Sequence, residues 1–173
     1  IGRSLTIGLT TPIAAFGALT LKSAGHFEAA MNKVGAVSGA TAGELNDLRN
    51  AAKDMGATTQ FSASQSADAL SFLAMAGFSA RQSIGALPGT LQLAASAQMG
   101  LADAADIVSN VLSGYGLEVS ELARVNDVLV KTFTSANTDL RQLGEAMKYA
   151  GPIASAAGVS FEEAAAAIGL MGN

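Results

Sequence analysis

The sequence predicts an all-α fold, an Ala-rich array of about eight or nine helices that begins with a long one. Alanine accounts for 36 of the 173 residues, and it loses no side-chain entropy in a helix. Helix starts are marked by capping boxes, in which a Ser or Thr accepts a backbone N–H and a Glu or Gln three residues later reaches back. No segment shows the apolar–polar alternation of a half-buried strand.

Start and stop signals divide the chain into helices. The capping boxes are Thr41/Glu44, Ser62/Gln65, Ser79/Gln82 and Ser160/Glu163. The expected stops are Gly56, Gly77, Gly114 and Gly158. The helices expected from these signals span residues 12–37, 42–55, 63–76, 80–86, 88–98, 101–113, 118–133, 139–157 and 161 onward. Pro88 suits a first helical position, and Pro152 is expected to bend or break its helix.

Apolar residues recur at helical spacing and predict which faces are buried. One stripe is Phe27, Met31 and Val34, and another is Leu122, Val125, Leu129 and Phe133. Because alanine buries little area, we expect a thin core with closely spaced helices. Such a core favours packing against partner chains, which would complete the buried surface. Helix-opening segments at Phe61, Leu101 and Leu140 lie roughly 40 residues apart, with a closer one at Phe161, which suggests stacked helical hairpins.

The charge balance excludes several classes of protein. The net charge is −4 and charged residues make up 14% of the chain, so we expect no specific nucleic-acid binding, which needs clustered Lys and Arg. Sparse charge also argues against disorder, and the absence of Cys excludes disulfides and thiolate metal sites.

The chain divides into a lead-in helix over residues 1–26 and a helical region over residues 27–173. Residues 4–21 form an 18-residue stretch without charge, long enough to cross a membrane. It contains four threonines and Pro12, however, so an apolar helix packed against protein is the alternative that we favour. Because the chain starts at Ile1 and ends within a helical pattern, we expect it to be part of a longer protein.

The titratable residues do not assemble into a reactive site. His26 is the single histidine and has no Cys to join it in a zinc site. Asp103 and Asp106 share a helix face, but they lie in a first turn, where the helix dipole favours negative charge. Glu162 and Glu163 are adjacent, diverge by about 100° around their helix, and have the same explanation.

The glycines and methionines also have structural explanations. There is no phosphate-binding Gly-Lys-Ser/Thr loop, and the spacing of Gly35 and Gly39 favours close approach of helices. We expect a core-filling role for the methionines, which are Met31, Met55, Met75, Met99, Met147 and Met171. We therefore expect no catalytic residues, no cofactor and no metal.

An ordered succession of segments resembles the core region of the phage tail tape measure protein, the phage minor tail protein family. It covers the chain from about Phe27 to the end. The segments are Phe27-Glu-Ala-Ala-Met, Val37-Ser-Gly-Ala-Thr, the stretch from Leu48 through Gly56-Ala-Thr-Thr-Gln-Phe-Ser-Ala-Ser-Gln, Ala69-Leu-Ser-Phe-Leu-Ala-Met-Ala-Gly-Phe-Ser-Ala, Ala86-Leu-Pro-Gly-Thr-Leu-Gln-Leu-Ala-Ala, Leu101-Ala-Asp-Ala-Ala-Asp-Ile-Val, Ala136-Asn-Thr-Asp-Leu-Arg-Gln-Leu-Gly-Glu-Ala-Met-Lys-Tyr, Gly151-Pro and Gly158-Val-Ser-Phe-Glu-Glu-Ala-Ala-Ala.

The resemblance implies a structural, non-enzymatic role. Such proteins lie in the tail tube lumen or tail tip of the virion, and in the host cytoplasm during assembly. They set the length of the tube and leave ahead of the genome. The implied partners are copies of the same chain, the tail tube protein, tail tip or baseplate hub proteins, and tail assembly chaperones. Contact with the host membrane during genome ejection is a further implication for residues 4–21.

The residues leave one other function open, a membrane-active helical protein such as a pore former. A tail scaffold should co-purify with tail tubes. A pore former should release dye from liposomes and lose that activity when Ile13→Asp and Leu19→Asp are introduced.

Overall fold

A computed structural model describes residues 23–172, and every regular element in that range is helical. The all-α prediction is therefore confirmed for this range, whereas the expected start of the first helix near Pro12, and most of the lead-in helix over residues 1–26, lie outside it. The elements are the helical segment 23–38, α2 (Ala42–Thr58), α3 (Ala63–Met75), α4 (Ala80–Ser96), α5 (Leu101–Tyr115), the 3-10 turn η1 (Val119–Glu121), α6 (Leu122–Ser135), α7 (Leu140–Ala156) and α8 (Phe161–Met171).

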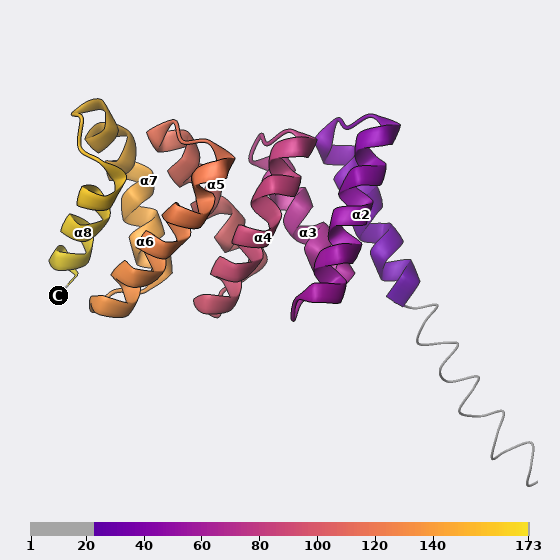
Figure 1. Cartoon of the computed structure of the whole chain (residues 1–173), viewed down its shortest axis with the longest axis horizontal. Helices are drawn as coiled ribbons and strands as arrows, with labels where there is room; N and C mark the ends of the chain where they lie inside the picture. Colours follow the sequence, from indigo (N-terminus) through magenta and orange to yellow (C-terminus); the bar gives the residue numbers. More distant parts are fainter. Residues whose placement is uncertain (1–22, 173) are drawn as a thin grey trace, which may run out of the picture.

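The helices stand side by side, and the chain advances from one end of the molecule to the other (Figure 1). They form two rows. In one row α2 contacts α4, α4 contacts α6 and α6 contacts α8, and in the other α3 contacts α5 and α5 contacts α7. Contacts across the rows join α2 with α3, α3 with α4, α4 with α5, α6 with α7, and α7 with α8. The array therefore has two different ends, one at segment 23–38 and α2, the other at α7 and α8.

The four predicted capping boxes are all present. At Thr41, for example, the backbone N–H donates to the Glu44 carboxylate at 2.9 Å, while the Glu44 N–H donates to the Thr41 hydroxyl at 3.3 Å. At the start of η1 the Glu118 backbone N–H donates to the Glu121 carboxylate at 3.2 Å, a contact that was not predicted because Glu118 is not a Ser or Thr. Capping boxes are local, so sequence alone places them correctly.

Two of the four predicted glycine stops are wrong. Gly77 and Gly158 follow helix ends with φ of +95° and +79°, as predicted, but Gly56 lies inside α2 and Gly114 inside α5. A Cβ on Gly56 would lie 2.5 Å from the backbone nitrogen of Ala63, so this glycine permits a close approach of backbones. Gly114 packs against Pro152, and α5 ends at Tyr115, followed by Gly116 with φ of +63°.

The predicted break at Pro88 is also wrong, since residues 80–86 and 88–98 are not separate helices. A single helix, α4, runs through Pro88. Ser83, Leu87 and Ala94 are buried on both sides of the proline at helical spacing. Burial of that continuous face outweighs the hydrogen bond that proline removes. In the same way α7 runs through Pro152 without a break.

The core forms two clusters along the array. One holds the predicted stripe Phe27, Met31 and Val34 against α2, α3 and α4. The other holds Leu122, Val125 and Leu129 against residues of α3, α4, α5, α7 and α8, with Phe133 partly buried beside it. The thin core expected from the alanine content depends on glycines at helix contacts. At Gly144, for example, an added Cβ would lie 2.5 Å from Cγ1 of Ile107.

Candidate functional site

The titratable residues singled out in the sequence are held apart by the fold. His26 is exposed on the helical segment 23–38. Asp103, in the first turn of α5, pairs with Arg141 of α7, whereas Asp106 is exposed. Across residues 23–172 no group of three or more His, Asp or Glu is arranged to hold a metal ion.

Glu162 and Glu163 take part in two different structural contacts. Glu162 pairs with Arg124 of α6, and the same guanidinium binds Glu121 at 2.7 Å. Glu163 accepts the backbone N–H of Ser160 at 3.0 Å, and this hydrogen bond lowers the pKa of its carboxyl. The hydrogen bond from Arg124 lowers the pKa of Glu121 as well. A general acid needs a raised pKa, so Glu121 and Glu163 are poorly suited to that role.

The methionine prediction is only partly right. Met31 and Met147 are buried, whereas Met75 and Met171 are 54% and 77% exposed. Met75 is the last residue of α3 and Met171 the last residue of α8, so each lies beyond the turns of its helix that pack against neighbouring helices.

The two glycines spaced for helix contact differ in their surroundings. Gly35 lies against Leu45, and an added Cβ would be 3.4 Å from the Leu45 Cδ2. Gly39 follows the helical segment 23–38 and has φ of +61°.

Tyr115 is a partly buried aromatic residue packed between helices. Its ring meets that of Phe161 edge-on, with centroids 5.5 Å apart, and it lies against Gly151. Burial raises the pKa of its phenol, and the hydroxyl is buried without a hydrogen-bond partner. The side chain thus joins α5, α7 and α8.

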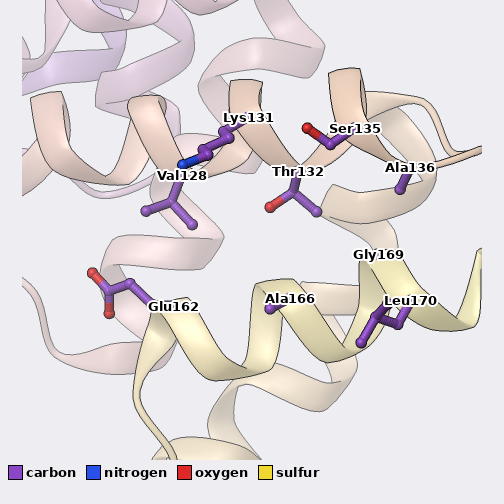
Figure 2. A pocket seen from close by; sticks show the side chains of 9 residues that line it. All are labelled: Val128, Lys131, Thr132, Ser135, Ala136, Glu162, Ala166, Gly169 and Leu170. Carbon is purple, nitrogen blue, oxygen red and sulfur yellow. The ribbon is translucent and has the colours of Figure 1, made fainter.

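A groove of about 480 Å³ lies between α6 and α8. Figure 2 shows the side chains of the two helices facing each other across it. Its lining is mostly apolar, with a charged residue from each helix, and consists of Val128, Lys131, Thr132, Ser135, Ala136, Glu162, Ala166, Gly169 and Leu170. Such a mostly apolar groove between two helices suits contact with another helix. Sequence reasoning missed it, since the groove depends on how α6 and α8 are placed.

Within residues 23–172 no helix is both long enough and apolar enough to cross a membrane. The uncharged stretch over residues 4–21 lies outside the described range.

The comparisons with known proteins decide the family. The family model described as phage-related minor tail protein matches residues 49–173. The chain belongs to this family. The match covers the region from α2 to the last helix, which contains most of the segments that carry the resemblance.

Curated relatives of this minor tail protein segment are named as tape measure proteins. It is 38% identical, over all 173 residues, to the tape measure protein of Pneumococcus phage Dp-1, of which it covers 15%. It is 32% identical over 128 residues to the probable tape measure protein of Escherichia phage P2, which is 74% of this chain and 16% of that protein. The segment thus spans about a sixth of the length of these relatives. No solved structure shows significant similarity to it.

Proposed function

We propose that this chain is a structural segment of a phage tail tape measure protein, which sets tail length, scaffolds the tail tube and leaves during genome ejection. The observation that carries the proposal is the 38% identity to a tape measure protein along the whole chain. The fold is compatible with it, because the described residues form an elongated helical array with contact surfaces and no converging catalytic groups.

The proposal extends to the surroundings of the chain. Its place is the lumen or tip of the virion tail, and its partners are the tail tube protein, the tip or baseplate hub, assembly chaperones and further copies of itself. An acidic chain with sparse charge favours this role, because each cluster of Lys and Arg would bind the phosphates of the DNA that must pass.

We also propose that the array is a stack of helical hairpins, with a unit of roughly 40 residues. Helices of one row, α3, α5 and α7, begin at residues 63, 101 and 140. Contacts between successive units recur at nearly the same sequence separation. The ion pairs Asp103–Arg141 and Arg124–Glu162 each join residues 38 apart, and the Asn126 amide donates to the carbonyl of Gly89, 37 residues away, at 2.8 Å.

Purified virions test the function. Mass spectrometry of isolated tails should detect peptides from this chain, and tails made with in-frame deletions elsewhere in the full gene should shorten as residues are removed. A gene product absent from tails, or tails of unchanged length after large deletions, would contradict the proposal.

A further inference from the structure

The end of the array at α7 and α8 exposes large apolar side chains. Tyr149 and Ile153 of α7 are 68% and 73% exposed, and Met171 of α8 is 77% exposed. Ala167 of α8 is exposed as well. After Glu163, α8 contains no charged residue. These four residues, Tyr149, Ile153, Ala167 and Met171, are called the C-terminal end surface below.

Helical geometry places this surface on the outer side of the last pair. Gly144 and Gly151 of α7 pack against Ile107 and Tyr115 of α5. At about 100° per residue, Ile153 lies roughly 180° around α7 from Gly144.

The same geometry holds for α8. Gly169 packs against Thr132 of α6, and Ala167 and Met171 each lie roughly 160° around α8 from Gly169. The four residues therefore point away from the array.

The opposite end of the molecule has a different character. The exposed face of α2, on the side away from its buried residues Leu48 and Ala52, carries Asn46, Asn50 and Asp54. In stacked-repeat proteins a terminal unit needs a polar outer face to remain soluble. The end at α2 meets that requirement and the end at α7 and α8 does not. The two lie at opposite ends of the array (Figure 1).

We propose that the C-terminal end surface is the docking site for one more helical hairpin of the same polypeptide, encoded after residue 173 in the complete gene. This inference rests on the stacked-hairpin arrangement proposed above. Each inner pair of helices has its outer side covered by the next pair, as α5 is by α7 and α6 by α8. Docking at α7 and α8 continues that established interface by one step.

The length and chemistry of the occupant follow from the same interfaces. Relatives that match this chain are several times longer, since the chain covers 15–17% of them, so residues for another unit are available in such a polypeptide. The incoming helix should place Gly or Ala over Tyr149 and Ile153, as α7 places Gly144 and Gly151 over α5, and should carry few charges on that face.

Cysteine accessibility tests this docking, because the chain contains no Cys. Ile153→Cys and Ala167→Cys are made singly, both in the 173-residue chain and in a chain extended by the next roughly 40 residues of its gene. Labelling by a thiol reagent should be at least about tenfold slower in the extended chain. The matched control Asn50→Cys, exposed on α2, should label at the same rate in both. Ala167→Cys changes little volume, so it reports even where Ile153→Cys fails to fold.

Two results would overturn the proposal. Equal labelling rates in the short and extended chains would show that no further hairpin covers the surface. Slower labelling of the short chain at higher protein concentration, matching that of the extended chain, would assign the surface to a second copy. The extended chain could be protected from labelling while its gene product is absent from tails. That result would support the docking site and contradict the tape measure function, so the two proposals can fail independently.

Discussion

At the residue scale, glycines set how closely the helices of one row approach each other. Gly144 of α7 receives the Ile107 side chain of α5, and an added Cβ would lie 2.5 Å from Cγ1 of Ile107 and 2.8 Å from its Cδ1. Ile107 is buried and β-branched, so it has little freedom to move aside. Gly43 is also helical, yet an added Cβ there would meet nothing within 4 Å.

Gly144→Ala should therefore lower the free energy of unfolding by about 1–2 kcal/mol, because overpacking outweighs the better helix propensity of alanine. Gly43→Ala should leave stability unchanged or raise it slightly. In an Ile107→Ala background the substitution at Gly144 should cease to destabilise, and urea denaturation of the double-mutant cycle measures that coupling. Additive effects of the two substitutions would show that these helices do not touch there.

At the element scale, four capping boxes predicted from the sequence define helix starts, and two of these four contain a titratable carboxylate. Hydrogen bonds from the backbone N–H groups of Thr41 and Ser160 lower the pKa values of Glu44 and Glu163. The corresponding residues of the other two boxes, Gln65 and Gln82, accept the same hydrogen bond without titrating. A pKa that is lower in the folded state contributes stability above the ordinary carboxyl pKa, and that stability is lost as the pH falls through the folded value.

The double variant Glu44→Gln/Glu163→Gln should thus lose less stability than the parent chain when the pH drops below the ordinary glutamate pKa of about 4.3. Urea midpoints measured across that range test this expectation. The reciprocal variant Gln65→Glu/Gln82→Glu should lose more. Identical acid profiles for all three proteins would mean that the capping hydrogen bonds do not contribute to the pH dependence.

Pro88 interrupts the backbone hydrogen bonding of α4 without ending the helix. Its side chain is exposed, so replacing it removes little packing. Pro88→Ala should raise the free energy of unfolding by about 2 kcal/mol. Proline destabilises a helix interior, and this penalty is partly offset because proline also restricts the unfolded chain. Pro152→Ala should gain less, because the Pro152 ring packs against Gly114. Thermal unfolding of both variants measures the difference, and a destabilised Pro88→Ala protein would contradict this account.

Across the whole molecule, local signals were predictable and those that depend on packing were not. The capping boxes, the buried stripe at Phe27 and the turn at Gly77 could be predicted because each depends on residues within a few positions. Gly56 and Pro88 were misread because neighbouring helices, not local preference, determine their roles. For the same reason the groove between α6 and α8 could not be predicted. It is lined by residues of two different helices, among them Thr132 of α6 and Gly169 of α8.

The compactness of the array predicts how this region contributes to tail length. Deleting residues 101–139, one α5–α6 unit, removes one layer of helices, and neighbouring helices pack about 8–10 Å apart. If the region stays folded as an array, tails should shorten by only about 10 Å. The same residues in one continuous helix would span about 60 Å at 1.5 Å per residue.

Because burial of the two core clusters stabilises the packed form, we expect the smaller change when mean tail lengths are measured by electron microscopy. The deleted chain should first be shown to unfold cooperatively, so that a folding defect is not mistaken for a length effect. Shortening near 60 Å would show that this region is unwound inside the tail and that the packed array is a form adopted only outside it.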